Sequence, residues 1–161
     1  ITQYELYKIL DQSEAFNGFA NRFIWLSVTR KQLVPMPKPM SNYMLAQFAE
    51  RLKDAIQAGQ KAGRISITTE AEDYWRKIYP EISKEHSGLT GVILNRSETH
   101  ILRLALVYAL LDVSKRIELK HLQVARSYWE FVEDSCRYIF GNMESSSTKR
   151  KILKALFMLL I

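Results

Sequence analysis

The stretch Asn95-Arg-Ser-Glu-Thr-His-Ile-Leu-Arg-Leu-Ala105, with the apolar residues that follow it to residue 112, predicts a long amphipathic helix. Its apolar residues recur every three or four positions, a spacing that keeps side chains on one face of an α-helix. Because Arg96 and Arg103 are nearly two turns apart, we expect both guanidinium groups on one face of this helix. The expected buried face consists of Ile101, Leu104, Ala105, Tyr108 and Leu111.

The same spacing predicts further helices on both sides of this stretch. Ser41 is a suitable N-cap for a helix that ends near residue 59. Thr69 and Glu72 form a capping box for the next helix, which we expect to end before Pro80. The last strong helix buries Leu122, Ala125, Trp129, Val132, Cys136 and Ile139. These patterns predict a mainly α-helical chain.

Both ends of the chain differ from this helical centre. Residues 3–10 predict a helix, and the aromatic and β-branched residues 22–29 predict a short strand. A linker with three prolines separates them from the helices that follow. Near the other end, Gly141 is expected to end the last strong helix, and a serine-rich joint precedes a new helix that begins at Thr148.

The composition of the chain limits its function class. Of 161 residues, 47% are hydrophobic, which is enough for a packed core and argues against disorder. The net charge of +6 agrees with binding to nucleic acid, whose phosphates attract basic side chains. The cluster that we expect to contact DNA consists of Lys149, Arg150, Lys151 and Lys154.

Several kinds of site are missing from the sequence. No glycine-rich loop of the P-loop type occurs, so the chain by itself cannot cradle nucleotide phosphates and lacks a complete active site. The three histidines and the single cysteine, Cys136, have no spacing typical of metal ligands, so we expect no metal site. No apolar run is long enough to span a membrane, and no signal peptide precedes the first helix, which predicts a cytoplasmic protein without a membrane partner.

The order of Arg96, Arg103-Leu-Ala and Tyr108-Ala, followed by a helix with Trp and Ala, resembles the α-helical lid of minichromosome-maintenance-type AAA+ helicases. This resemblance implies that Arg96 is the sensor 2 residue, which contacts the terminal phosphate of the nucleotide, and that Arg103 supports the same site. The triplet Asn21-Arg-Phe is similar to the arginine-finger motif of that family, although Asn21 stands in place of a serine. The implied role of Arg22 is to reach the nucleotide of a neighbouring subunit.

A larger part of the chain, residues 12–141, resembles the C-terminal region of primase–helicase proteins of phages, plasmids and integrated elements. The similar phrases are Asn17-Gly-Phe-Ala-Asn-Arg-Phe-Ile-Trp25, Leu102-Arg-Leu-Ala-Leu-Val-Tyr-Ala-Leu-Leu-Asp112 and Tyr138-Ile-Phe-Gly141. The resemblance implies the C-terminal, ATP-sensing part of a DNA replication helicase of a mobile genetic element. Such a protein works as an oligomeric ring on DNA.

This resemblance also implies the architecture. We expect a helical bundle like the AAA+ lid, with a small α/β remnant at the N-terminus. Residues 1–34 would be the distal end of an ATPase core, residues 35–144 the lid domain, and residues 145–161 the start of a truncated domain that resembles a winged helix. ATP and Mg²⁺ would bind only together with the missing ATPase core, which is then the partner of this chain; the chain alone would hold no cofactor.

A second interpretation remains open at this point. The chain could be a non-enzymatic helical module that binds nucleic acid or a replication protein through its basic surfaces. In that case Arg22 would pair with a local carbonyl or carboxylate group, and Arg96 and Arg103 would be solvated charges on an amphipathic helix, as most surface charges are.

Overall fold

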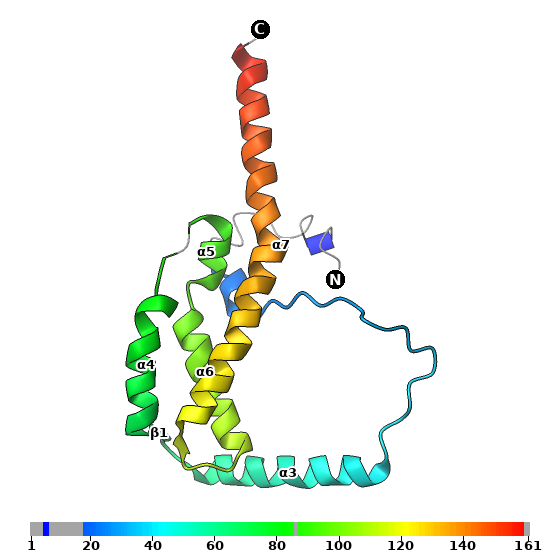
Figure 1. Cartoon of the computed structure of the whole chain (residues 1–161), viewed down its shortest axis with the longest axis vertical. Helices are drawn as coiled ribbons and strands as arrows, with labels where there is room; N and C mark the ends of the chain where they lie inside the picture. Colours follow the sequence, from blue (N-terminus) through cyan, green and yellow to red (C-terminus); the bar gives the residue numbers. More distant parts are fainter. Residues whose placement is uncertain (1–4, 7–17, 86, 160–161) are drawn as a thin grey trace. The chain divides into compact units, whose positions relative to one another are not determined.

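The computed structural model describes residues 5–6, 18–85 and 87–159, with side chains described no further than residue 141. Its described part is mainly helical, which confirms the predicted fold class. The predicted helix at residues 3–10 lies outside the described residues, apart from Glu5 and Leu6, which are helical. The elements are η1 (Ala20–Arg22), α3 (Asn42–Lys61), β1 (Ser66–Ile67), α4 (Thr69–Ile82), α5 (Gly88–Leu94), α6 (Ser97–Leu111), β2 (Arg116–Ile117) and α7 (Leu119–Leu159) (Figure 1).

The chain divides into two compact units that alternate along the sequence. The first unit comprises the described residues within Ile1–Ser27, Ser83–Ser97 and Trp129–Ile161. The second comprises Val28–Ile82 and Glu98–Tyr128. The predicted division into consecutive domains at 1–34, 35–144 and 145–161 stays a prediction.

The core of the second unit is built from α6 and the beginning of α7. Ile101, Ala105 and Ala109 recur every four residues on α6 and are fully buried, as are Leu122 and Ala125 on α7. Alanines at these positions allow helix backbones to approach closely. The predicted burial of Ile101 and Ala105 is confirmed, whereas the predicted burial of Leu111 is wrong, because its side chain is 47% exposed.

A small parallel sheet joins the segment between α3 and α4 to the segment between α6 and α7. Strand β1 pairs with β2 in the register Ser66 to Arg116 and Ile67 to Ile117. Next to it, Thr68 is the N-cap of α4, because its hydroxyl accepts a hydrogen bond from the Ala71 N–H at 3.4 Å. The predicted cap, Thr69, is therefore wrong by one residue. The predicted end before Pro80 is also wrong, because α4 includes this proline near its last turn.

The connection between α6 and α7 is held by charged and polar groups around Asp112. Its carboxylate lies 2.8 Å from Lys120 Nζ and 3.2 Å from His121 Nε2. The Nδ1 atom of the same buried histidine accepts a hydrogen bond from the Glu118 N–H at 3.0 Å. His121 thereby satisfies a free N–H at the start of α7, as a glutamate does in a capping box. Hydrogen bonds from Lys120 and then His121 lower the pKa of Asp112 below its ordinary value.

In the first unit, the residues of α7 that the sequence predicts to be buried lie in the core. Trp129, Val132 and Cys136 are each 1% exposed, and Ile139 and Phe140 are buried beside them. Burial raises the pKa of the Cys136 thiol to about 12, so the group stays a neutral thiol in the core.

The predicted end of this helix at Gly141 is wrong, because α7 continues to Leu159. A glycine inside a helix costs about 1 kcal/mol relative to alanine but does not force the helix to end. Gly141 does not adopt the positive φ that is common after a helix end and that Gly63 adopts after α3.

The strand predicted at residues 22–29 is also wrong. Its first residue ends the 3₁₀ helix η1, and the residues that follow pair with no other strand in the described part of the chain. Aromatic contacts hold this segment instead. The Trp25 ring packs edge-on against Phe140 with 5.4 Å between ring centroids, and Trp25 Nε1 donates to the Ala20 carbonyl at 2.8 Å.

The buried tryptophan of α7 gives a direct test of this core. We expect Trp129→Ala to lower the free energy of unfolding by roughly 3–5 kcal/mol, because truncation leaves a large cavity. The control is Phe131→Ala on the same helix, where the ring is 47% exposed and the loss should stay below about 1 kcal/mol. Urea unfolding followed by circular dichroism measures both values; equal losses would contradict the assigned core.

Asp112 gives a second test, through pH. Because folding lowers its pKa, the carboxylate stabilises the fold at neutral pH, and this contribution disappears as the pH falls through its folded pKa. We expect Asp112→Asn to lower the melting temperature at pH 7 and to have no effect in strong acid. A difference between the two proteins that does not change with pH would show that the charge of Asp112 is unimportant.

Candidate functional site

A hydrogen bond between two asparagine side chains joins distant parts of the first unit. The Asn21 amide nitrogen lies 2.8 Å from the Asn95 side-chain oxygen, across 74 positions of sequence. Asn21 belongs to η1 and is 3% exposed, and Asn95 is the C-cap residue of α5. Consequently η1 packs at the C-terminal end of α5.

The two asparagines in this contact each directly precede a predicted site residue. Arg22 directly follows Asn21, and Arg96 directly follows Asn95. Both side chains are exposed, and within the described residues neither guanidinium makes a hydrogen bond or an ion pair. Two arginines with no partner among the described residues thus directly follow a hydrogen-bonded pair of asparagines.

The backbone at Arg96 differs from the prediction. Instead of one long helix, α5 ends at Leu94, and α6 begins at Ser97, with Asn95 and Arg96 in a turn. The Ser97 hydroxyl donates to the Leu94 carbonyl at 2.5 Å and satisfies an acceptor that the interrupted helix leaves free. Arg96 therefore precedes the helix that carries Arg103, and the prediction that the two share a face of one helix is wrong.

Arg103 belongs to the second unit, whereas Arg22 and Arg96 belong to the first. Its side chain is exposed on α6 and makes no hydrogen bond or ion pair with the residues described. Its assignment to the nucleotide site stays a prediction.

Other arginines in the same chain are engaged in structural contacts. Arg126 is buried on α7 and pairs with Glu81 of α4 at 3.1 Å. Arg76 pairs with Glu72 on the exposed side of α4 at 2.6 Å, and this pairing raises its pKa. The comparison separates arginines whose donors are already in use from those, such as Arg22, Arg96 and Arg103, that donate to none of the described residues.

The predicted DNA-binding cluster lies in the last part of α7. Lys149, Arg150, Lys151 and Lys154 are helical in the structure. Their side chains lie outside the described residues, so their role stays a prediction.

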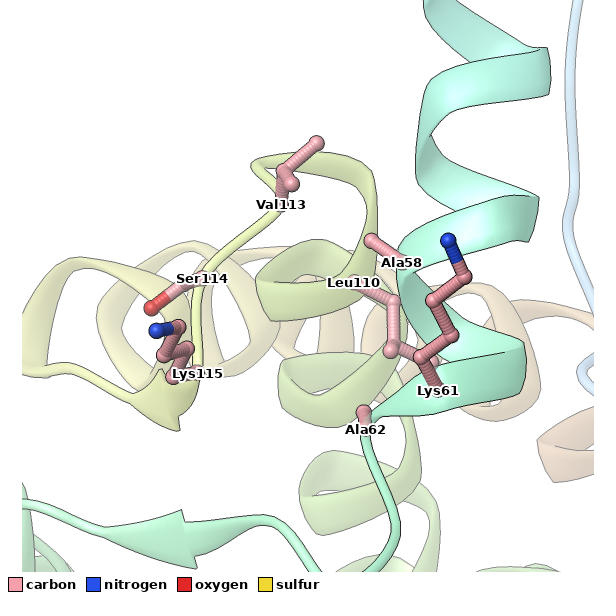
Figure 2. Close-up of a pocket in the computed structure, with 7 residues that line it drawn as sticks. All are labelled: Ala58, Lys61, Ala62, Leu110, Val113, Ser114 and Lys115. Atoms are coloured by element: carbon pink, nitrogen blue, oxygen red, sulfur yellow. The ribbon is translucent and has the colours of Figure 1, made fainter.

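A hollow of about 340 Å³ lies in the second unit, between the end of α3 and the α6–α7 connection (Figure 2). Its floor is apolar, and two lysines contribute to its rim. None of the arginines predicted to contact nucleotide lines it. The lining residues are Ala58, Lys61, Ala62, Leu110, Val113, Ser114 and Lys115.

The described residues contain neither a group of metal ligands nor a membrane-spanning helix. No group of three or more potential ligand residues there could hold a metal ion. Among the helices of the same described residues, none is both long and apolar enough to cross a membrane.

Comparison with known proteins adds no relative. No family model matches the chain, and no curated protein and no solved structure shows significant similarity to it.

The sequence does not predict the contact between Asn21 and Asn95, which directly precede the two arginines. In the sequence, Asn21 is a departure from a helicase motif and Asn95 is the residue before Arg96. Polar contacts between distant residues leave no periodic signal, because periodicity reports burial along a single element. Only the position of both asparagines directly before an arginine could have drawn attention to them.

A double-mutant cycle tests the contact between the asparagines. We expect Asn21→Ala to destabilise the chain by about 1–2 kcal/mol, because it removes a buried hydrogen-bonding group. The coupling between Asn21→Ala and Asn95→Ala should be about 1 kcal/mol, measured by urea unfolding. As a control, Asn21→Ala and Gln47→Ala should be additive; additivity in the asparagine pair as well would mean that the two side chains do not interact.

Proposed function

We propose that this chain is the C-terminal, ATP-sensing part of a DNA replication helicase of the primase–helicase type, from a mobile element. In this proposal the chain is not active alone. An ATPase core supplies the phosphate-binding loop and Mg²⁺, and this chain supplies arginines.

The observation that carries the proposal is the position of Arg22 and Arg96. Both are exposed, neither donates to a described residue, and both adjoin the asparagines that hydrogen-bond at 2.8 Å. An arginine side chain presents a fork of donors that suits phosphate oxygens, and its charge is permanent. Two such groups attached at neighbouring points can bind the same polyphosphate.

This arrangement refines the roles implied by the resemblance. If Arg22 and Arg96 bind one nucleotide together, that nucleotide lies at a boundary between this chain and an ATPase core. In phosphoryl transfer the charge spreads over the equatorial oxygens, and catalysis consists mainly of positioning and electrostatic stabilisation. The arginines would therefore act only when the boundary is closed, which couples hydrolysis to the geometry of a ring of subunits.

The remaining parts of the proposal follow from the same assembly. The basic cluster Lys149, Arg150, Lys151 and Lys154 would contact DNA phosphates, and the net charge of +6 favours this partner. Arg103 would support the nucleotide site. The assembly would be cytoplasmic, with ATP and Mg²⁺ bound mainly by the core.

One observation favours the alternative, a non-enzymatic helical module that binds other macromolecules. Helix α3 buries only Ala55 and exposes large apolar side chains along one face. Exposed apolar surface of this kind is typical of interaction sites. It bears on protein partners and gives no role to the position of Arg22 and Arg96 beside the hydrogen-bonded asparagines, so we prefer the helicase proposal.

Turnover of ATP by the protein that joins this chain to its ATPase core tests the proposal. We expect Arg22→Ala and Arg96→Ala each to reduce kcat by roughly 10³, because each removes a charge that stabilises the transition state. The matched control is Arg64→Ala, an exposed arginine with no role in the proposal, which should retain full turnover. Normal turnover by the first two variants, with the fold intact by circular dichroism, would overturn the proposal.

A further inference from the structure

The turn that follows α6 contains a valine in a backbone conformation that valine rarely adopts. Val113 has a φ of 55°, in the left-handed region that favours glycine. Its N–H donates to the Leu110 carbonyl at 3.0 Å, and the next N–H, of Ser114, donates to the Ala109 carbonyl at 2.9 Å. These are the two hydrogen bonds of a Schellman motif, in which glycine usually occupies the position of Val113.

Burial of the side chain repays only part of this strain. A β-branched side chain at a positive φ destabilises the fold, and the side chain of Val113 is 50% exposed. Strained residues cluster at active sites and ligand-binding sites. Val113 belongs to the wall of the hollow between the end of α3 and the α6–α7 connection. The hollow is therefore the place to look for a role of this valine.

The hollow has the size and the floor of a site for a small organic molecule. Its volume of about 340 Å³ lies at the lower end of the range of ligand pockets. Ala58, Ala62 and Leu110 line it with apolar atoms. Beside them, Gly59 lets α3 approach α6 closely, because a Cβ atom there would lie 3.4 Å from Leu110 Cδ2. The bound part of a ligand would thus be small and apolar.

The charged residues that line the hollow are both lysines. Lys61 belongs to the last turn of α3 and Lys115 to the α6–α7 connection, on the other side of the hollow (Figure 2). Neither amino group pairs with a described residue. The acidic residues next to this connection, Asp112 and Glu118, do not line the hollow, and both already pair with Lys120.

The helix ends beside the hollow oppose an anion only in part. Helices α3 and α6 both end here, and the C-terminal end of a helix carries about half a negative charge. A lysine ammonium group carries a full positive charge. Two lysines therefore exceed the two helix ends, and the sum of these charges favours an anionic ligand.

We propose that this hollow binds a small amphipathic organic anion, with its apolar part on the floor and its charged group near Lys61 and Lys115. The proposal goes beyond the proposed function and needs no nucleotide. Because the ligand is small and the lysines are exposed, binding is weak. For hexanoate, a six-carbon carboxylate, we expect a dissociation constant on the order of 1 mM.

Titration of the 161-residue chain with hexanoate, followed by NMR, tests the proposal. We expect saturable changes in the amide signals of residues 58–62 and 110–115. Hexanol has the same apolar part without the charge and should bind several-fold more weakly. Acetate has the charge without the apolar part and should not bind measurably. No saturable change tenfold above the expected dissociation constant, changes confined to other residues, or equal affinity for hexanol would overturn the proposal.

Lysine substitutions test the charged part of the site. We expect Lys61→Gln and Lys115→Gln each to weaken hexanoate binding about two- to fivefold at low salt, since each removes an exposed charge, and to leave hexanol binding unchanged. The matched control is Lys53→Gln on the same helix, because Lys53 pairs with Glu50 and lies outside the hollow. An equal loss in all three variants would show a general effect of charge and contradict the proposal.

Val113→Gly separates binding from folding. We expect its melting temperature not to fall, because relief of the backbone strain offsets the loss of a half-exposed side chain, whereas its affinity for hexanoate should fall. The control is Val107→Gly, since Val107 is 49% exposed but lies inside α6. This control should have a lower melting temperature and unchanged affinity. A lower melting temperature in Val113→Gly, or unchanged affinity, would mean that the valine serves the fold and would overturn the proposal.

Discussion

The hydrogen bond between Asn21 and Asn95 is the constraint on which the interpretation of this chain depends. It joins η1 to the turn between α5 and α6, which are 74 residues apart. Aromatic packing supports the same junction, because Trp25 donates to the Ala20 carbonyl and packs against Phe140. Without this contact, Arg22 and Arg96 would be unrelated surface charges. With it, Arg22 and Arg96 directly follow two residues that are in contact within one packed unit.

The charged side chains of this molecule differ in whether they pair with other described residues. Arg126 is buried in a pair with Glu81, and Asp112 is held by Lys120 and His121. These charged groups pair within the chain and hold its helices in place. Among the described residues Arg22 and Arg96 make no such pair, and most of the apolar face of α3 is exposed. In the proposed function, these two arginines bind a polyphosphate that is held mainly by an ATPase core.

The sequence predicted the helical architecture and the buried seam of α7 because both depend on local periodicity. Trp129 and Cys136 lie in the core as expected, and Ser41 caps α3. The failures concern places where distant groups override local preference. Residues 22–29 have the composition of a strand, but aromatic anchors hold them without a neighbouring strand. The helix break at Asn95 is stabilised by the Ser97 hydroxyl and by Asn21, and neither contact follows from spacing. For the candidate site, the roles of the two arginines stay a prediction, and the contact between the asparagines that precede them does not follow from the sequence.

The most direct test of the central claim is a double-mutant cycle on nucleotide affinity in the protein that contains the ATPase core. If Arg22 and Arg96 bind the same polyphosphate, the losses of ATP binding free energy caused by Arg22→Ala and Arg96→Ala should not add. We expect a coupling of at least about 1 kcal/mol between them, measured by calorimetric titration. Losses that add would place the arginines at separate sites, and unchanged affinity in both single variants would contradict the account altogether.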